Sequence, residues 1–444
     1  MNFDKLNYHN QQAQLPEGDA RNLPKGWEIK KLGEVCEIVN GSTPLRTNKE
    51  FWENGNFPWF TIDDIREQGR IITETKQKVT DVALTKLRVL PADTVLLCCT
   101  ASVGEYAITK IELTTNQQFN GLVVKDRKKL HPEFLMHYCS TLKNKLLGLS
   151  GKTTIDFIAI SKLKNLEIPL PPLPEQQRIV SILDEAFAAI DKAKANAEQN
   201  LSNANELFEN AAQIIFTEKG NDWEEKLLGE FATFRNGINY TKGSKGEKVQ
   251  IVGVKDFQKR YWVPENDLVE VSLDGQLNDT DLLQEGDILA VRSNGNPQLI
   301  GRTLLAGKIE GRVSHSGFTI RIRLESKEVS PNYLCHFLKI RDTRKKLVDS
   351  GNGVGIRSLN QGSLSSLVVP FPKSLKEQVA IVDKVDSIAE QSQKLKDIYQ
   401  RKLDDLEELK KSVLQKAFAG ELHLEAGTEP VEVAVPKTKK RHAV

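Results

Sequence analysis

Residues 175–216 read EQQRIVSILDEAFAAIDKAKANAEQNLSNANELFENAAQIIF, a run of about 42 residues without proline or glycine. Apolar or small side chains recur through it in steps of four and three, with one additional step of four. They are Ile179, Leu183, Ala186, Ile190, Ala193, Ala197, Leu201, Ala204, Phe208, Ala211 and Ile215. This heptad spacing with one stutter predicts a long helix packed against another helix. At about 1.5 Å per residue it spans roughly 60 Å, more than a compact domain needs internally.

The same pattern returns 202 residues later, with its stutter at the same place. Its members are Ile381, Val385, Ile388, Ser392, Leu395, Tyr399, Leu403, Leu406, Lys410, Val413 and Ala417, of which Ser392 and Lys410 do not suit an apolar seam. Two long helices of one chain usually pair antiparallel, and we expect that arrangement here. Separate homodimeric coiled coils are the alternative.

The segments before the helices repeat as well. WEIKKLGE (27–34) recurs as WEEKLLGE (223–230), an offset of 223 − 27 = 196, and each copy is followed by an Asn-Gly pair, at 40–41 and 236–237. Further matches follow at offsets of 199 and 202 residues, so the insertions between the copies are small and lie in loops. The chain is therefore predicted to hold two copies of one unit, each a globular domain followed by a long helix.

Proline-rich segments precede both helices, IPLPPLP (168–174) and VPFP (369–372). Proline holds its own segment extended and keeps the preceding residue out of the helical region. We therefore expect each globular domain to end on a stiff, strand-like segment.

Within each globular part, short β-rich runs alternate with loops rich in Gly, Asn, Ser and Thr. The runs are residues 94–99, 121–124, 287–291 and 318–323, and one helix is expected after them in each copy, at about 132–147 and 331–347. The predicted fold class is α/β (α+β): two similar mixed α/β domains joined by two long helices in an antiparallel coiled coil, with an internal pseudo-two-fold repeat.

Composition narrows the class of protein. The five cysteines, Cys36, Cys98, Cys99, Cys139 and Cys335, form no C-x-x-C pair, which argues against a disulfide framework or zinc ribbon. No run approaches the roughly 18 apolar residues of a membrane span, and the first residues do not resemble a signal peptide. A cytoplasmic protein without membrane contact is expected.

The formal net charge of +2 is unevenly distributed. Lys and Arg minus Asp and Glu give 22 − 17 = +5 for residues 21–172, 3 − 7 = −4 for 173–216 and 22 − 20 = +2 for 217–372. The positive charge lies in the globular parts, where phosphate attraction would draw nucleic acid, although ordinary solvated surface explains so small a charge equally well.

Several motifs in order give the chain a specific resemblance over about residues 23–420. They are LPxGW (23–27), LGE (32–34), GSTP (41–44), FPWFTxDD (57–64), LPADTVL (90–96), SVG (102–104), NQ (116–117) and IPLPPLPEQQ (168–177). In this order, and duplicated with the helices, they resemble the specificity subunit of a type I restriction-modification enzyme. The second copy lacks the FPW and SVG motifs and has Ser374 and Leu375 in place of Leu173 and Pro174.

The resemblance implies two target recognition domains, each reading one half of a bipartite asymmetric site in double-stranded DNA. It implies a helix pair that holds them apart and docks two methyltransferase (modification) subunits, with restriction/translocase subunits as further partners. It also implies no catalysis and no cofactor in this chain: S-adenosylmethionine, and ATP and Mg for restriction, belong to partner subunits. The expected division is 1–20 flexible N-terminus, 21–172 target recognition domain 1, 173–217 helix 1, 218–373 target recognition domain 2, 374–419 helix 2 and 420–444 flexible tail.

Base reading needs side chains with paired donors and acceptors on loops that can enter the major groove. The candidates in the first domain are Arg46, Thr61, Asp63, Thr100, Ser102, Asn116, Gln117, Gln118, Lys152 and Thr153. Those in the second are Asn239, Lys242, Lys255, Arg292, Ser293, Asn294, Asn296, Ser314, His315, Asn352 and Arg357. Arg292 is the strongest single candidate, because an arginine can bind guanine O6 and N7 together. Lys125, Arg127, Lys128 and Lys129 are expected to contact phosphate or solvent.

Catalytic alternatives are weaker. No Asn-Pro-Pro-aromatic or Asp-Pro-Pro-Tyr motif of an adenine methyltransferase is present. SGKTT (150–154) has Leu146 where a P-loop requires its first glycine, and Asp63 or Asp64 with Glu74 and Lys76 would make a Mg²⁺ nuclease site only by permissive spacing. His137 and His336 fall at matching positions, which favours a structural role over metal binding. A duplicated scaffold that binds protein partners, or the DNA-recognition subunit of another methyltransferase-based defence system, remains the alternative.

Overall fold

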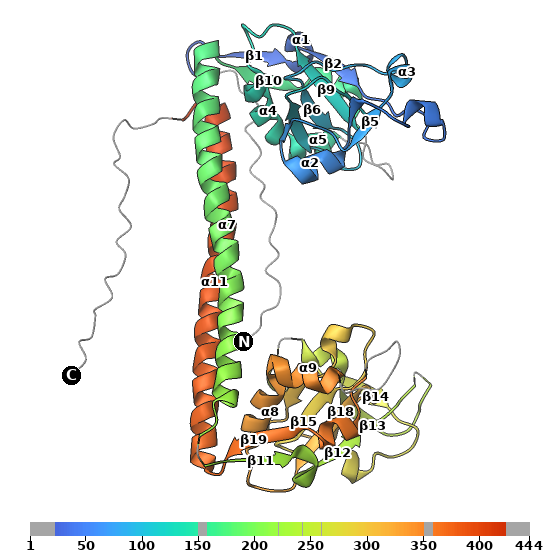
Figure 1. The fold of residues 1–444 in the computed structure, drawn as a ribbon, viewed down its shortest axis with the longest axis vertical. Helices are drawn as coiled ribbons and strands as arrows, with labels where there is room; N and C mark the ends of the chain where they lie inside the picture. The colour runs from blue at the N-terminus through green and yellow to red at the C-terminus, as the bar shows by residue number, and fades with distance from the viewer. Residues whose placement is uncertain are drawn as a thin grey trace, which may run out of the picture. The chain divides into compact units, whose positions relative to one another are not determined.

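The computed structural model describes residues 23–149, 158–220, 222–241, 243–258, 260–349 and 358–422. The chain divides into two compact units, Met1–Ala195 with Asp404–Val444 and Asn196–Leu403. Each unit contains one globular domain, here domain 1 (residues 21–172) or domain 2 (218–373), and one end of both long helices (Figure 1). No helix in the described ranges combines the length and the apolar character needed to cross a membrane.

Domain 1 is built on a five-stranded sheet and two smaller ones. The main sheet has the order β2 (Cys36–Asn40), β9 (Phe119–Val124), β6 (Val95–Cys98), β7 (Tyr106–Thr109) and β4 (Ile71–Ile72). The second sheet has the order β5 (Gln77–Val79), β3 (Phe57–Phe60) and β8 (Thr114–Thr115), and β1 (Glu28–Lys31) pairs with β10 (Glu167–Leu170). Its helices are α1 (Leu32–Val35), α2 (Ile62–Gln68), α3 (Asp81–Leu84), α4 (Pro132–Ser140), α5 (Lys143–Leu149) and α6 (Ile160–Lys164), with a 3₁₀ turn η2 (Lys49–Phe51).

Domain 2 repeats this arrangement. Its sheets have the orders β12 (Ala232–Asn236), β18 (Thr319–Leu324), β15 (Ile288–Val291), β16 (Thr303–Leu305), and β14 (Val269–Ser272), β13 (Lys248–Val252), β17 (Val313–His315), and β11 (Trp223–Leu227) pairs with β19 (Val368–Pro372). Its helices are α8 (Pro331–Lys339), α9 (Arg341–Asp349) and α10 (Gln361–Ser365), with 3₁₀ turns η3 (Leu228–Glu230), η4 (Val254–Phe257), η5 (Asp279–Asp281) and η6 (Pro297–Leu299). In both domains the three-stranded sheet joins one antiparallel and one parallel pair. The main sheet of domain 2 lacks a counterpart of β4 within the described residues, but the missing FPW motif leaves the strand pairing of the three-stranded sheet unchanged.

The four strand predictions are confirmed by β6, β9, β15 and β18. The proline segments also form strands, since β10 pairs with β1 and β19 pairs with β11.

The prediction of one helix after the strands is wrong in both domains, because the helix is broken. α4 ends at Ser140 and α5 starts at Lys143, and α8 ends at Lys339 before α9 starts at Arg341. Ile340 takes an extended ψ of 137°. The breaks bury Leu142 and Ile340 in the domain cores, so core packing outweighs continued helical hydrogen bonding.

The long helices are α7 (Leu173–Thr217) and α11 (Leu375–Ala419), as the heptad pattern predicts. In the first unit, Asp191 lies 3.1 Å from Lys410 and Lys194 lies 2.6 Å from Glu407, so three residues forward on α7 match three backward on α11. The pair is therefore antiparallel. In the second unit, the seam exception Ser392 is buried, and its hydroxyl donates to the Ala204 carbonyl at 2.7 Å.

The long helices also complete the domain cores. Ile179 and Leu183 of α7, with Phe418 of α11, lie in the core of domain 1, where Phe418 packs on Phe134. Phe216 of α7 lies in the core of domain 2. Because each core includes residues from the ends of the long helices, neither domain has a complete hydrophobic core without them.

A glutamine fixes each domain to its helix. Gln176 donates through Nε2 to the carbonyls of Lys129 and Pro171 and accepts from the His131 amide. Gln378 makes the same three contacts with Glu328, Pro372 and Ser330. Both side chains are fully buried, so their polar atoms are matched by main-chain groups rather than by water.

Candidate nucleic-acid interface

In both domains the same two main-chain hydrogen bonds hold a glycine against one turn, and this arrangement is called the backbone frame below. The amide of Gly41 donates to the Phe119 carbonyl and that of Ser42 to the Thr115 carbonyl; Gly237 and Ile238 make the matching bonds to Thr319 and His315. A Cβ at either glycine would collide with main-chain carbonyl oxygens of the turn. Only glycine allows this approach, which explains why the Asn-Gly pair is present in both copies.

The turn following β8 in domain 1 displays three amide side chains. The Asn116 Oδ1 accepts from the Gln118 amide at 3.0 Å, and Asn116 Nδ2 donates to Gln118 Oε1 at 3.1 Å. Gln117 is exposed and bonds to the Thr43 hydroxyl. The sequence-predicted residues Asn116, Gln117 and Gln118 are thus brought together on one turn, with partners that limit their rotamers.

Arg46 is held between two tryptophans in the same domain. Its guanidinium carbon lies 3.9 Å from the ring centroid of Trp52 and 4.5 Å from that of Trp59, and Nη1 donates to Gln77 Oε1 at 2.8 Å. The side chain is still exposed, although partial burial lowers the pKa of Arg46. Contact with the two perpendicular rings and the hydrogen bond to Gln77 restrict the guanidinium, whose planar donor fork can bind guanine or phosphate.

The other candidates of domain 1 differ in accessibility. Thr100 and Ser102 are half-buried beside Ala101, whose φ is +61°, and the Ser102 amide donates to the Thr100 carbonyl. Asp63 is exposed and paired with Arg66 at 2.9 Å. Thr61 is buried at the start of α2, so it offers no side-chain surface to a base.

The carboxylates considered for Mg²⁺ have structural partners. Asp64 is fully buried and accepts from the amides of Thr61 and Lys76, both at 2.7 Å. Lys76 pairs with Glu67 at 2.5 Å. Within the described residues no three His, Cys, Asp or Glu side chains are grouped as metal ligands would be. These contacts give the nuclease hypothesis no support.

The loop after β15 carries the arginine-containing candidates of domain 2. The main-chain amides of Arg292 and Ser293 both donate to the Phe318 carbonyl, and the Arg292 carbonyl accepts from the Leu359 amide. Asn294 Oδ1 accepts from the Asn296 amide, while the Asn296 side chain accepts from Gln298. Asn239, Lys255 and Asn296 are exposed, whereas Arg292, Ser293 and Asn294 are half-buried.

Two candidates of domain 2 are buried. Ser314 donates to the Asp281 carbonyl, and His315 Nδ1 lies 2.8 Å from the Thr319 hydroxyl. Burial, with the nearby charges of Arg321, Arg235 and Arg323, lowers the pKa of His315 to about 3. His315 therefore ties β17 to β18 and Ser314 ties β17 to η5, so their polar atoms bond within the domain rather than to an external ligand.

Five candidates lie outside the described residues: Lys152, Thr153, Lys242, Asn352 and Arg357. The P-loop-like segment 150–154 lies outside them as well.

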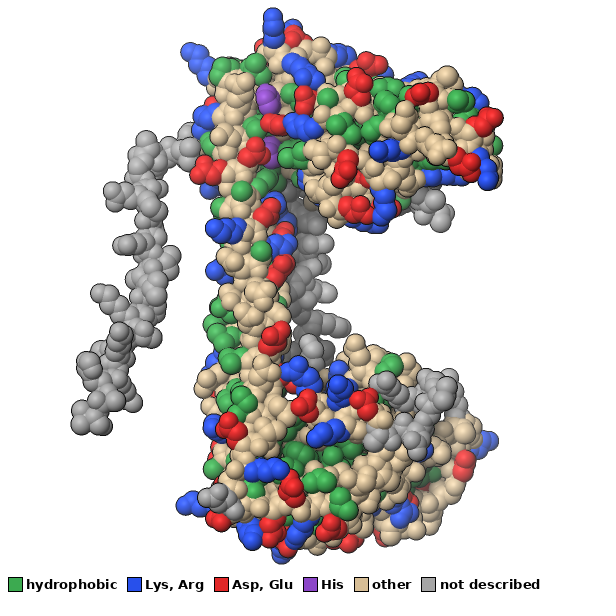
Figure 2. Space-filling view, in the orientation of Figure 1, with side chains coloured by type: hydrophobic (Ala, Val, Ile, Leu, Met, Phe, Trp, Pro, Cys, Tyr) green, Lys and Arg blue, Asp and Glu red, His purple; other side chains and the backbone are tan. Residues whose placement is uncertain are grey.

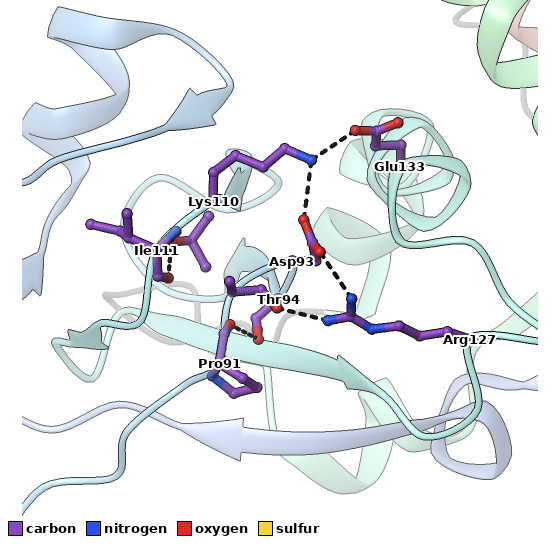
Figure 3. Close-up of polar contacts among 9 residues, drawn as sticks. Pro91, Asp93, Thr94, Lys110, Ile111, Arg127 and Glu133 are labelled. Atoms are coloured by element: carbon purple, nitrogen blue, oxygen red, sulfur yellow. Dashed lines mark hydrogen bonds and ion pairs between the residues drawn. The ribbon is translucent and has the colours of Figure 1, made fainter.

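The basic cluster expected to contact phosphate is partly used inside domain 1. Arg127 donates to Asp93 at 3.0 Å and to the Ala92 carbonyl at 2.9 Å, and Lys110 bridges Asp93 and Glu133 at 3.1 and 2.7 Å (Figure 3). Asp93 has a φ of +63°, where domain 2 has Gly286 at +87°. The two cations explain why a non-glycine residue is retained in this conformation. Lys125 likewise donates to the Gly33 carbonyl. The side chains of Lys125 and Arg127 remain exposed, so contact with phosphate or solvent stays a prediction for all four basic residues of this segment.

The paired histidines join each domain to a long helix. His137 Nε2 lies 2.9 Å from Asp184 of α7, and His336 Nε2 lies 3.2 Å from Asp386 of α11. Burial lowers the pKa of both histidines. A structural role is therefore confirmed for both positions.

Sequence reasoning missed an open cavity in domain 2. Its volume is about 1020 Å³, and its lining includes Tyr240, Lys255, Val269, Asn294 and Phe318. Exposed aromatic residues within a Gly-Ser loop were the available signal. Over the visible face of each unit, basic and acidic side chains are interleaved (Figure 2). The positions of individual side chains therefore say more about a DNA-binding surface than the net charge of each domain does.

A family model for the type I restriction modification DNA specificity domain matches residues 24–199 and 220–401. The StySPI specificity subunit of Salmonella potsdam is 25% identical over 422 residues, 90% of this chain and 90% of that subunit. The EcoKI specificity subunit of Escherichia coli strain K12 is 25% identical over 432 residues, 91% and 90% of the two chains. The MjaIX subunit of Methanocaldococcus jannaschii is 29% identical over 278 residues, 58% of this chain and just under two thirds (64%) of that subunit.

Two solved structures share the fold. A chain from a study of complex assembly and conformational transition in the type I R-M system has a TM-score of 0.74 at 20% identity, covering 90% of this chain and 99% of its own. The HsdS subunit of Thermoanaerobacter tengcongensis has a TM-score of 0.57 at 20% identity, covering 90% and 98%.

Proposed function

Because this chain belongs to the family of type I restriction-modification DNA specificity subunits, we propose that each of its domains reads one half of a bipartite, asymmetric DNA site. One observation carries this proposal. The same glycine-based frame supports the turn after β8 and the turn after β17, but the turns display Asn116, Gln117 and Gln118 in one domain and Ser316, Gly317 and Phe318 in the other. A shared frame with different side chains is what two different half-sites require.

Direct base reading would fall to the accessible candidates. In domain 1 these are Arg46, Asp63, Thr100, Ser102, Asn116, Gln117 and Gln118; in domain 2 they are Asn239, Lys255, Arg292, Ser293, Asn294 and Asn296. Arginine suits guanine and the amides suit adenine, because each can form two hydrogen bonds with one base edge. Lys152, Thr153, Lys242, Asn352 and Arg357 stay predictions from sequence.

We propose that the chain itself is not catalytic and acts with partners. Two methyltransferase (modification) subunits would dock on α7 and α11 and bind S-adenosylmethionine, and one of them would reach a flipped adenine in each half-site. ATP and Mg for restriction would be bound by a restriction/translocase subunit. Since its ligand is chromosomal DNA, the complex would act in the bacterial or archaeal cytoplasm.

The helix pair would set the spacing between the half-sites. Each helix has 45 residues, which corresponds to about 68 Å at 1.5 Å per residue. Bases between the half-sites would be spanned without being read.

Sequencing the methylated bases in cells that carry this chain with its partner methyltransferase tests the first part of the proposal. A bipartite motif with an unread spacer is expected, together with a DNA affinity of the complex that falls steeply with salt. A continuous motif would refute the reading of two half-sites, whereas salt-independent capture of proteins alone would favour a protein-binding scaffold.

The spacer is tested by inserting one helical turn of four residues between Ala197 and Leu201, with four matching residues between Tyr399 and Leu403. One turn adds about 6 Å, or roughly two base pairs, so a longer unread spacer is expected in the methylome. Replacing the same positions without changing helix length is the control. An unchanged spacer in the lengthened variant would refute the ruler function.

A further inference from the structure

The turn between β17 and β18 presents an aromatic ring to solvent on a rigid base. Phe318 is 60% exposed, the most exposed aromatic among the large hydrophobic residues of the described chain. Its amide donates to the Ser316 hydroxyl at 3.3 Å, and the Thr319 amide closes the turn on the Ser316 carbonyl at 2.8 Å. The main chain that carries the ring is therefore held in place before any ligand arrives.

The ring belongs to the wall of the cavity in domain 2. Tyr240 and Val269, 39% and 42% exposed, contribute further apolar surface, while Ser293, Asn294 and Lys255 contribute polar groups. Lys255 is an exposed cation. A surface that is mainly apolar, with a few hydrogen-bonding groups and one cation, fits a ligand that is itself partly apolar and carries negative charge nearby.

The matching turn of domain 1 identifies the class of ligand. Phe318 corresponds to Gln118, since each directly precedes the long strand that pairs with the strand ending in Asn-Gly. An amide at this position suits a base edge with donors and acceptors. A phenyl ring can make neither bond, but it can contact the 5-methyl group of thymine, which is the apolar feature of the major groove.

We propose that Phe318, with the cavity beside it, reads a thymine of the second half-site through its 5-methyl group, while Lys255, a base-reading candidate from the sequence, contacts a neighbouring phosphate instead. This inference rests on the proposed function, because it names the base class at one position of that interface.

The test uses the full chain assembled with its partner methyltransferase, and duplexes that carry its methylated motif. Each thymine is replaced in turn by deoxyuridine, which removes only the 5-methyl group. One replacement is expected to weaken binding by the wild type roughly three- to tenfold, the effect of burying one methyl group. Phe318→Ala should bind both duplexes equally, and Phe318→Leu should retain part of the preference.

Two controls keep the result specific. Val368→Ala removes another exposed apolar side chain of the same unit, 47% exposed and outside the cavity lining, and should keep the full preference for thymine. Thermal melting of Phe318→Ala should match the wild type, because the ring is largely in solvent.

The outcomes separate this inference from the function on which it rests. Sequence-specific binding that no deoxyuridine alters, or a preference that Phe318→Ala retains, would overturn the thymine contact alone. Weaker binding of Phe318→Ala to every duplex, with no loss specific to deoxyuridine, would point to a stacking wedge and also overturn it. Loss of all sequence preference in the wild type would refute the proposed function itself.

Discussion

Phe216 of α7 packs against Tyr333 of α8, with ring centroids 5.1 Å apart. Exactly 202 residues later in the sequence, Phe418 of α11 packs on Phe134 of α4 at 5.2 Å. Both phenylalanines are buried in the core of the domain they meet. Each long helix therefore ends as a core element of a globular domain.

Phe216→Ala should lower the free energy of unfolding by about 3–5 kcal/mol, because it leaves a cavity beside Tyr333 and Phe337. Urea titration followed by tryptophan fluorescence measures the loss. Ile214→Ala is the matched control, since Ile214 is 50% exposed two residues earlier on the same helix. Equal losses of unfolding free energy in both variants would show that the buried Phe216 ring contributes no more than an exposed side chain of the same helix.

Gln378→Met should cost roughly 2–4 kcal/mol, because it leaves the Ser330 amide and two carbonyls without their buried partner. Hydrogen exchange should show faster exchange at the first turn of α8. Gln393→Met, at an exposed position of α11, is the control and should change neither measurement. Unchanged exchange in the Gln378 variant would contradict a fixing role for this side chain.

Arg46→Lys keeps the charge but loses the planar fork that lies against Trp52 and Trp59. If Arg46 reads a base, discrimination at one position of the first half-site should fall by about 1–3 kcal/mol while the salt dependence stays nearly the same. Competition binding with single-base variants of the motif measures this. Lys49→Arg, an exposed side chain in the same loop, should have no effect; a uniform loss over all duplexes would mean that Arg46 contacts phosphate.

His315 should make the free energy of unfolding fall as the pH is lowered below about 6.5. Its pKa is about 3 in the folded chain, below its usual 6.5, so the unfolded chain binds this proton first. The stabilising effect is complete above about pH 6.5 and is lost as pH falls towards 3, by about 1.4 kcal/mol per pH unit.

The wild type and His315→Asn are compared by urea unfolding at pH 7 and pH 5, because asparagine does not titrate. The wild type should lose about 2 kcal/mol more than the variant over this interval. Other titrating groups are common to both proteins and cancel. Equal losses of unfolding free energy in the wild type and the variant would show that His315 is protonated in the folded chain.

The heptad spacing was sufficient to predict α7 and α11, because apolar periodicity reports directly on which side of a helix is buried. It could not explain Ser392 and Lys410. Ser392 bonds to the Ala204 carbonyl, and Lys410 reaches Asp191 and lies 4.8 Å from the centre of the Phe187 ring. Both partners are distant in sequence, so only the folded chain shows why these polar residues fit the seam.

At the candidate interface, too, some side-chain positions could be predicted from the sequence and others could not. The sequence placed Ser314 and His315 in a polar loop, yet they belong to β17 and are buried, while their neighbour Phe318 is exposed. The direction of a side chain in a strand depends on its register with partner strands, and here β17 pairs with β13 across more than sixty residues. Local residue type does not reveal that register.

Heptad spacing and repeated motifs were enough to predict the duplicated architecture, the two long helices, four of the strands and the family resemblance, because periodicity and motifs are local properties of the chain. The folded chain was needed to show which polar residues face solvent, how Arg46 lies against Trp52 and Trp59, and that the equivalent turns display amides in one domain and a phenyl ring in the other. Those features arise from contacts between distant segments, where burial and main-chain hydrogen bonding choose the orientation of each side chain.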